Sequence, residues 1–416
     1  MSIGKWFPPQ GKTVCLQKWS QVSLYLWDNT SSSCHRNLPR QIPDDYDFHN
    51  TPLLQTHRQK MLNGEWPADG NGCEHCKDQE QAGGMSDRIN FLSRESNKRY
   101  VPIEVYKDPL LTKIKPTQIS VHFNNKCNLK CLYCGPNLSS AWVKEEWEHG
   151  QKGSYKFDPW ELDSTYKSKV EKFYKWMDEN YAGLKAFDLL GGEPFIQTET
   201  WECVDWMIAH PNLECDVEIY SNMQVKPVLF KRGIEKLKQL AKTVKEVRFV
   251  ASIDCWGAAT EYVRYGMDME TFETNMQYLV EHGEDIIPTM NWTVSSLSIP
   301  YIKELIEKVI TWQQIKQVSV NYNKCIDPII FDPHIMPNGT YSKNIEEILE
   351  MNKIMFKDDP VSAEYAKGIF NEIDNSPANP TKITELKDRL DELDRRRNTD
   401  WKLVFPWLVA INEKNI

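Results

Sequence analysis

The stretch TQISVHFNNKCNLKCLYCG, residues 117–135, joins an apolar, β-rich run to three closely spaced cysteines. Residues 117–123 predict a β-strand, because β-branched and aromatic residues are enriched in strands. Cys127, Cys131 and Cys134 follow it with C-x3-C-x2-C spacing, in a loop rich in Asn and Lys. The stretch therefore predicts a strand whose carboxyl end leads into a loop with three thiol groups.

Further β-rich runs follow along the chain, and they alternate with longer segments in which charged and apolar residues have helical spacing. Six strands alternating with helices imply right-handed βαβ units, an α/β fold and a parallel sheet, either open or closed into a full or partial barrel. In both arrangements the functional site lies at the carboxyl ends of the strands. The further runs are residues 184–190, 215–221, 246–253, 286–294 and 316–323.

The pattern divides the chain into three predicted domains. Residues 1–112 contain few periodic segments and many turn formers, so they predict a small irregular domain that needs a staple to hold its fold. Residues 113–335 carry the alternating strands and helices, and residues 336–416 predict a helical extension. Within that extension, residues 383–401 have leucines at helical spacing among alternating charges, which predicts a solvated helix without chemistry.

Composition limits the class of protein. The chain has 416 residues, of which 40% are hydrophobic and 26% charged, and no apolar run approaches the length of a membrane span. No signal peptide begins the sequence, so we expect a cytoplasmic protein without a membrane partner. A net charge of −9 argues against a large nucleic-acid-binding surface. The eleven cysteines are clustered, which in a reducing compartment favours metal binding over disulfides.

Three interpretations of Cys127, Cys131 and Cys134 remain open on residue types alone. Buried free cysteines are common in protein cores. Structural zinc takes four ligands, and no fourth ligand is obvious nearby. A 4Fe-4S cluster held by three thiolates keeps one iron open to a small molecule.

The C-x3-C-x2-C motif, with Tyr133 before its last cysteine and after the first strand of a (βα)6 pattern, resembles that of the radical S-adenosylmethionine (SAM) superfamily. The resemblance implies a partial (βα)6 TIM-like barrel and a 4Fe-4S cluster on the three cysteines, with SAM bound at the open iron. It also implies reductive cleavage of SAM to a 5′-deoxyadenosyl radical that takes hydrogen from a substrate. Flavodoxin or ferredoxin is the usual reductant in this family.

Other positions that the family uses around SAM lie at the ends of the next predicted strands. In LLGGEPF, residues 189–195, the resemblance implies that Glu193 binds the amino group of SAM. A bland loop is the alternative for the Gly-Gly turn, and a helix N-cap is the alternative for the small polar residues after the third strand. The predicted cofactor-binding residues are Tyr133, Gly191, Gly192, Glu193, Ser221, Asn222, Ser252 and Arg264.

Two residues are candidates for catalysis. Asp254 follows the fourth strand and is a candidate proton acceptor for a substrate radical or cation, or else a cap of the next helix. Cys325 lies just past the last strand. It is a candidate hydrogen donor or an additional cluster ligand, or else a thiol that only packs.

Four cysteines precede the first strand of the sheet: Cys15, Cys34, Cys73 and Cys76. Four thiolates satisfy either tetrahedral zinc or a fully ligated 4Fe-4S cluster. Their segments resemble the twitch auxiliary-cluster module of the SPASM group, although that module usually follows the barrel. The resemblance implies a second, auxiliary 4Fe-4S cluster that accepts or relays an electron.

The substrate stays open at this point. Relatives with auxiliary clusters modify peptide or protein side chains by oxidation or crosslinking, whereas others oxidise or epimerise small molecules such as sugars and aminoglycosides. We expect a peptide or protein substrate. An iron-sulfur electron carrier and a zinc-stabilised binding protein are the alternatives from other classes. The aromatic-rich residues 140–166 either cover the substrate cavity or pack on the outside of the sheet.

Overall fold

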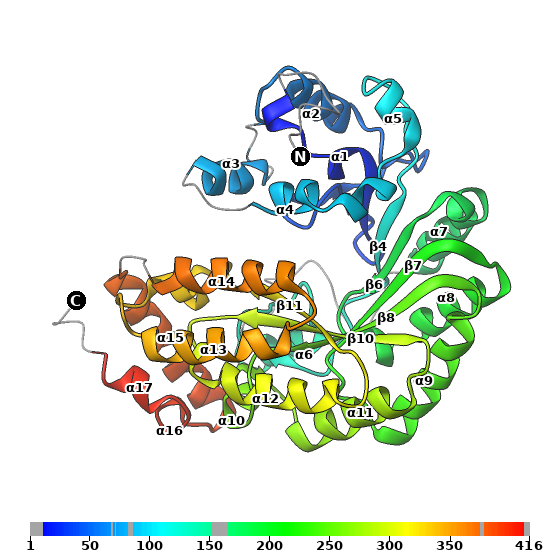
Figure 1. Cartoon of the computed structure of the whole chain (residues 1–416). Coiled ribbons are helices and arrows are strands. Elements are labelled where there is room, and N and C mark those ends of the chain that lie inside the picture. The colour runs from blue at the N-terminus through cyan, green and yellow to red at the C-terminus, as the bar shows by residue number, and fades with distance from the viewer. Residues whose placement is uncertain are drawn as a thin grey trace.

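A computed structural model describes residues 11–411 except 68–69, 71, 82–85, 151–164 and 375–377. The described chain forms a large α/β body and an N-terminal part that lies above one end of its sheet (Figure 1). A mixed α/β fold with a parallel sheet is therefore confirmed.

Six strands of the sheet are parallel neighbours in the order in which they occur along the chain. Each corresponds to one of the predicted β-rich runs. Within the described residues the strand order is linear, with β11 at one edge, so the sheet is open rather than a closed barrel. The strands are β4 (Gln118–His122), β6 (Ala186–Leu190), β7 (Asn212–Ser221), β8 (Val244–Ile253), β10 (Ile286–Val294) and β11 (Ser319–Lys324).

Helices between consecutive strands cover the outer face of this sheet (Figure 1). Strand residues that point to the helices, such as Phe187, Val217 and Phe249, are fully buried and apolar. Polar residues such as Asp188 and Glu218 alternate with them and lie on the opposite face, as the period of a strand requires. The helices are α7 (Tyr166–Asn180), α8 (Thr198–Ala209), α9 (Pro227–Leu240), α11 (Met269–His282) and α12 (Ile302–Gln313).

The N-terminal part extends this sheet. Strand β1 (Gln21–Tyr25) pairs in parallel with β4, and β2 (Thr30–Ser32) and β3 (Arg40–Gln41) add two antiparallel strands beyond it. The irregular-domain prediction did not include this continuation. Short helices complete the region: α1 (Gln17–Ser20), α2 (Pro52–Leu62), α3 (Cys73–Gln81), α4 (Asp87–Ser93) and α5 (Ile103–Lys107).

The N-terminal part also has an apolar cluster of its own, contrary to the expectation that it lacks core pattern. Val14, Trp19, Met61, Val105 and Ile114 are buried together in it. These residues come from segments far apart in sequence, so no local period reveals them.

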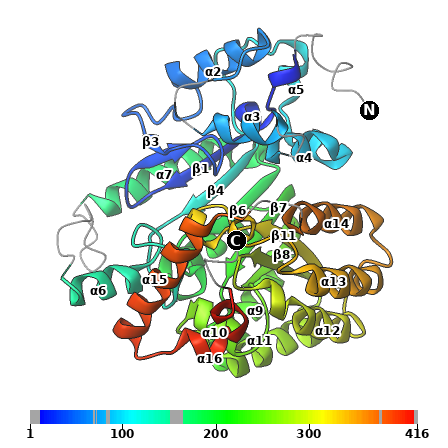
Figure 2. The same ribbon diagram turned by 90° about the vertical axis from the view of Figure 1, so that its left-hand side faces the viewer.

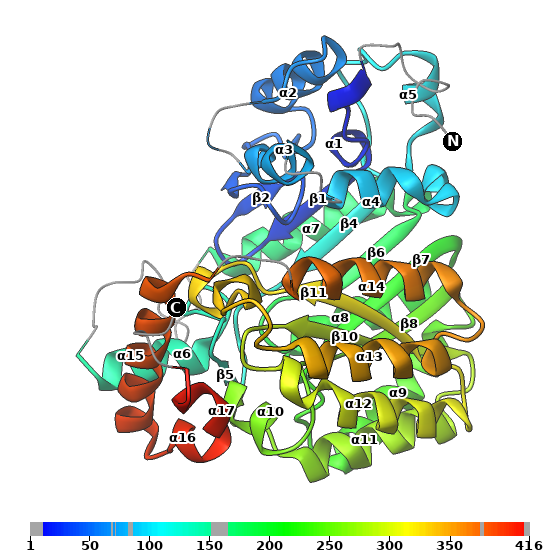
Figure 3. The same ribbon diagram turned by 60° about the vertical axis from the view of Figure 1, so that its left-hand side comes forward.

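The C-terminal residues form helices that pack back onto the α/β body: α13 (Ser342–Met355), α14 (Pro360–Asp374), α15 (Pro380–Arg397), α16 (Trp401–Val404) and α17 (Pro406–Val409). The prediction of a solvated helix over residues 383–401 is wrong, because Ile383, Leu386, Leu390 and Leu393 of α15 are fully buried. Figures 2 and 3 show α15 beside α6 (Ser140–Glu148), the helix that follows the cysteine loop. The helical spacing of the leucines thus marks the face of α15 that packs against the rest of the protein.

Within the described ranges, none of the helices has the length and apolar character needed to cross a membrane. The first part of the aromatic-rich segment is α6, where Trp142 is buried by packing. Its residues 151–164 lie outside the described residues, so the prediction that they cover a cavity stays a prediction.

Candidate active site

A cavity of about 260 Å³ opens at the carboxyl ends of the parallel strands. All three cysteines of the motif lie on its wall, together with residues from the ends of several strands. The predicted residues that line it are Cys127, Cys131, Tyr133, Cys134, Gly191, Gly192, Glu193, Ser221, Asn222, Ser252 and Arg264. His122, Tyr220, Asn291 and Thr293 also line it, and the sequence analysis did not select them.

The start of α6 holds the cysteine loop. Ser139 caps this helix by accepting from the backbone N–H of Trp142, and its hydroxyl donates to the carbonyl of Leu129 at 2.7 Å. The Ser140 hydroxyl accepts from the backbone N–H of Cys127 at 3.1 Å. The indole Nε1 of Trp142 donates to the carbonyl of Cys131 at 2.9 Å. The loop conformation is therefore fixed by the protein itself before any ligand binds.

A short two-stranded ribbon gives the loop a second support. Strand β5 (Lys130–Cys131) pairs antiparallel with β9 (Arg264–Tyr265), with Cys131 opposite Arg264. The backbone N–H of Leu132 also donates to the carbonyl of Val263 at 2.8 Å. This pairing brings Arg264 to the cavity from the end of α10 (Ala258–Val263).

Gly191 and Gly192 are needed where the second strand passes the cysteine loop. Both have positive φ values, of 92° and 52°. A Cβ on Gly192 would lie 2.2 Å from the carbonyl oxygen of Lys126, and one on Gly191 would lie 2.8 Å from Cβ of His122. Glycine is therefore required because this turn passes close to His122 and to the cysteine loop.

Glu193 is oriented by three hydrogen bonds. Its Oε1 accepts from the Ser221 hydroxyl at 2.8 Å and from the Phe195 backbone N–H at 3.1 Å, and its Oε2 accepts from the Asn222 backbone N–H at 2.6 Å. A carboxylate has about four lone-pair positions, so one remains for a ligand. Burial raises the pKa of Glu193 to about 7, although these hydrogen bonds act in the opposite direction.

Ser221 and Asn222 do not cap the next helix, since Lys226 occupies the N-cap position of α9. The side-chain amide of Asn222 instead donates to Asn128 Oδ1 at 2.9 Å and lies 3.9 Å from Sγ of Cys127. Asn222 therefore connects the carboxylate of Glu193 to the first cysteine of the loop.

Tyr133, Asp254 and Arg264 form a buried polar group beside the loop. The Tyr133 hydroxyl donates to Asp254 at 2.8 Å and accepts from Arg264 Nη1 at 2.8 Å, while Arg264 Nη1 lies 3.2 Å from Asp254 Oδ1. Asp254 is fully buried and is not among the cavity-lining residues. It does not cap α10, whose N-cap is Gly257. Its role as a proton acceptor stays a prediction.

The Nε atom of Arg264 is buried and has no hydrogen-bond partner within the described residues. The Arg264 side chain as a whole lines the cavity, so its guanidinium brings a positive charge to an anionic group there.

The three thiols suit a cluster that binds with loss of protons. Burial raises the pKa of all three, to about 12 for Cys134, so the thiols are neutral in the metal-free protein. No three His, Cys, Asp or Glu side chains, among those described, converge closely enough to hold a single metal ion. A 4Fe-4S cluster binds each thiolate to a different iron, so its ligands stand further apart than those of one ion. Donor type, loop and cavity fit such a cluster.

Cys325 follows β11, is buried, and has Sγ 3.8 Å from the carbonyl of Asp327. It is absent from the cavity lining, so its predicted role in hydrogen donation is not supported by position and stays a prediction. Cys203, Cys215 and Cys255 are fully buried.

The four early cysteines are brought together although 61 positions separate the first from the last in sequence, from Cys15 to Cys76. Cys15 and Cys73 are buried in the same N-terminal apolar cluster. Burial is the main cause of a raised pKa for Cys15, and the nearby charges of Cys34 and Cys76 raise it further. Cys34 has the same effect on Cys73. The four thiols therefore lie in one region of the N-terminal part, although no three of them, among the described residues, converge closely enough to hold a single metal ion.

The sequence did not point to Lys18, whose positive charge acts on Cys15, Cys34 and Cys73. Its side chain is buried, with Nζ donating to Ser33 Oγ at 2.8 Å and to Asn37 Oδ1 at 2.6 Å. Asn37 in turn donates to Sγ of Cys73 at 3.8 Å. No carboxylate in the described chain pairs with this ammonium, which leaves the cysteines as its nearest groups able to become anions. The relation of Lys18 to these cysteines is visible only in the folded structure.

No protein-family model matches the chain, and no curated protein matches it. Similar solved structures include Streptococcus suis SuiB bound to S-adenosylmethionine, with 15% identity over 74% of this chain and 63% of that one, at a TM-score of 0.39. SuiB bound to precursor peptide SuiA has 16% identity over 71% and 60%, at 0.38. TYW1 with a lysine-pyruvate adduct has 12% identity over 56% and 70%, at 0.30. Structural similarity at this level does not establish a function, so we infer the function from the geometry of the site.

Proposed function

We propose that the chain is a radical SAM enzyme in which Cys127, Cys131 and Cys134 hold a 4Fe-4S cluster and SAM occupies the adjoining cavity. The observation that carries this proposal is the cavity itself. It joins three thiols of one loop to an oriented carboxylate at the carboxyl edge of a parallel sheet. A closed electron-carrier cluster has no use for such a carboxylate.

The residues of the cavity have complementary roles toward the methionine part of SAM. Glu193 binds the ammonium through the lone pair that its three protein donors leave unused. Arg264, which lines the cavity, brings its guanidinium charge to the carboxylate. Tyr133 and Asp254 hold the Arg264 guanidinium in place from behind. Ser252 and Asn222 complete the polar wall.

When bound, a reduced cluster would supply the single electron that cleaves SAM to methionine and a 5′-deoxyadenosyl radical. The chain's own contribution is to orient SAM and to exclude water from the cavity. Flavodoxin or ferredoxin is the proposed reductant.

We assign an auxiliary 4Fe-4S cluster to Cys15, Cys34, Cys73 and Cys76. The support is the buried ammonium of Lys18, whose charge acts on Cys15, Cys34 and Cys73 and would compensate negative charge on thiolates. This cluster would accept an electron from the substrate or relay one to it. Four thiol groups are also the donor type of structural zinc, and metal analysis separates the two.

For the substrate we propose a peptide or protein side chain, with a small molecule such as a sugar or aminoglycoside as the alternative. An extract from cells grown on deuterated medium, separated by size, tests this. Deuterium in 5′-deoxyadenosine after incubation with the polypeptide fraction supports the proposal, and deuterium only from the small-molecule fraction contradicts it.

Anaerobic reconstitution tests the enzyme class. About eight irons per chain, as two 4Fe-4S clusters require, and formation of 5′-deoxyadenosine from SAM with dithionite are expected. A colourless protein that contains zinc would instead establish the zinc-stabilised binding protein, and iron without SAM cleavage would indicate an electron carrier.

A further inference from the structure

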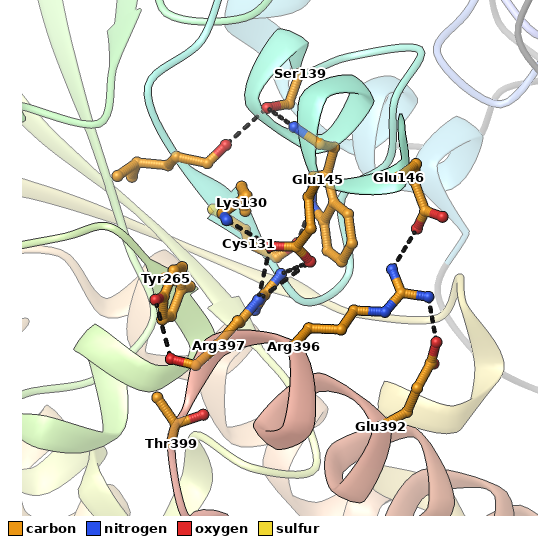
Figure 4. Close-up of polar contacts among 12 residues, drawn as sticks. Lys130, Cys131, Ser139, Glu145, Glu146, Tyr265, Glu392, Arg396, Arg397 and Thr399 are labelled. Atoms are coloured by element: carbon orange, nitrogen blue, oxygen red, sulfur yellow. Dashed lines mark hydrogen bonds and ion pairs between the residues drawn. The ribbon is translucent and has the colours of Figure 1, made fainter. Parts of the chain in front are cut away.

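The last turn of α15 lies against the cysteine loop, some 250 residues earlier in the chain (Figure 4). Arg397, the final residue of this helix, directs its guanidinium to Glu145 of α6. Its Nη2 lies 3.1 Å from Oε1 and its Nε lies 3.2 Å from Oε2, so the pair is bidentate. Only 2% of either side chain is exposed, which makes the pair a buried one. Glu145 also binds Lys130 of the loop.

Two aromatic rings enclose the same guanidinium. Its Cζ lies 4.7 Å from the ring centre of Trp142 and 4.6 Å from that of Tyr265. Arginine stacks on aromatic faces in this way through cation–π attraction, which is stronger when the group is desolvated. The Tyr265 hydroxyl also donates to the backbone carbonyl of Arg397 at 3.4 Å.

Each partner of Arg397 is connected to Cys131 or its neighbour. Trp142 donates to the carbonyl of Cys131 at 2.9 Å. Tyr265 stands opposite Lys130 in the β5–β9 ribbon, next to the pair of Cys131 and Arg264. Glu145 binds Lys130 itself. One side chain from the C-terminal helix thus supports residues 130 and 131 by three separate routes.

We propose that Arg397 is a positioning residue for Cys131, and that α15 acts as a clamp on the cysteine loop from the side opposite the cavity. The assignment of a cluster to that loop rests on the proposed function, whereas the clamp on the loop backbone does not. A lysine cannot replace Arg397 fully, because its single ammonium lacks the planar fork and the stacking faces.

The neighbouring Arg396 is a matched control. It lies on the same helix turn and binds Glu146 of α6 at 3.1 Å and Glu392 of α15. Within the described residues, neither Trp142 nor Tyr265 stacks on the guanidinium of Arg396. Removing its charge perturbs the contact of α15 with α6 without touching Trp142, Tyr265 or Lys130.

Hydrogen exchange of the metal-free protein tests the clamp. The backbone N–H of Leu132, which donates to Val263 next to Cys131, is the reporter. We expect Arg397→Gln to accelerate its exchange roughly tenfold or more, because Glu145 loses its bidentate partner and the loop opens more often. Arg397→Lys should give an intermediate rate, and Arg396→Gln should stay within about twofold of the wild type. Equal rates in Arg397→Gln and the wild type would overturn the proposal.

Trp142→Phe keeps an aromatic face for Arg397, but it removes the indole N–H that donates to Cys131 together with part of the buried indole. It decides the matter should Arg397→Gln fail to fold, as judged by circular dichroism. Faster exchange at Leu132 in Trp142→Phe supports the clamp, and wild-type exchange overturns it.

Reconstituted protein gives the second readout. We expect Arg397→Gln to lose the iron of the three-cysteine site faster in air and to broaden the electron paramagnetic resonance signal of that cluster, while Arg396→Gln resembles the wild type. A wild-type protein that takes up no iron at this site would refute the proposed function, yet the exchange result on metal-free protein would stand.

Discussion

Asn222 donates its backbone N–H to Oε2 of Glu193 at 2.6 Å, at the point where strands β6 and β7 end side by side. The same residue extends its amide toward Sγ of Cys127. Asn222 thereby contacts both the carboxylate of Glu193 and the thiol of Cys127, which could bind the two ends of one ligand. This arrangement supports a ligand that bridges the loop and the sheet.

Glu193→Gln should weaken SAM binding to the reconstituted protein by roughly tenfold to a hundredfold, because an ionic hydrogen bond to the ammonium becomes a neutral one. Equilibrium dialysis with labelled SAM measures the change. Glu202→Gln, on the exposed face of α8, is the control and should bind as the wild type does. Unchanged affinity in Glu193→Gln would remove Glu193 from the cofactor site.

The affinity for SAM should also depend on pH. Burial raises the pKa of Glu193 to about 7, so below that pH the group is increasingly neutral. Binding of an ammonium needs the ionised form, so affinity should rise with pH up to about 7 and fall by at most about tenfold per pH unit below it. Titrations between about pH 5.5 and pH 7.5 measure this dependence. Glu193→Gln should flatten the profile, and a steep profile in that variant would assign the titration to another group.

Gly192→Ala should destabilise the metal-free protein by about 2–4 kcal/mol. The added Cβ meets the Lys126 carbonyl oxygen at 2.2 Å in a backbone with φ of 52°, so the cysteine loop must move. Thermal unfolding followed by circular dichroism checks this. Gly183→Ala is the control, because nothing lies within 4 Å of a Cβ there. Equal losses in both variants would mean that the close approach is not what requires glycine.

The two cysteine groups should separate on substitution. Cys131→Ala is expected to abolish 5′-deoxyadenosine formation, since the three-cysteine site loses a ligand. Cys73→Ala should retain SAM cleavage but lose turnover of the substrate, because only the auxiliary site is affected. Chromatography of 5′-deoxyadenosine measures the first effect. Wild-type cleavage in both variants would show that the sites are assigned wrongly.

Lys18→Met should make the reduction potential of the auxiliary cluster more negative, because the buried positive charge favours the reduced, more anionic cluster. A redox titration followed by electron paramagnetic resonance measures the potential. Lys12→Met is the matched control: Lys12 is exposed, so solvent screens its charge, and the potential should stay at the wild-type value. A wild-type potential in Lys18→Met would separate the ammonium from any cluster at this site.

The six parallel strands and the site could be predicted because the features that reveal them lie close together in the sequence. Buried parallel strands leave short apolar runs, and the residues that meet at a carboxyl edge follow those runs directly, as Glu193 follows β6 and Asn222 follows β7. Strand β1 was not predicted, because residues 26–117 separate it in the chain from β4, the strand with which it pairs. The apolar cluster around Trp19 was not predicted either, since its residues come from separate segments of the chain.

The sequence by itself determined six strands of the parallel sheet and which edge of it receives the thiols and Glu193, because period and spacing are properties of adjacent residues. Only the tertiary structure decided what surrounds them. Three arrangements join residues far apart in the chain: Lys18 near Cys15, Cys34 and Cys73, the buried group of Tyr133, Asp254 and Arg264, and the contact of Arg397 with Glu145. Burial makes each of these charges depend on its partners, and burial is known only once the chain has folded.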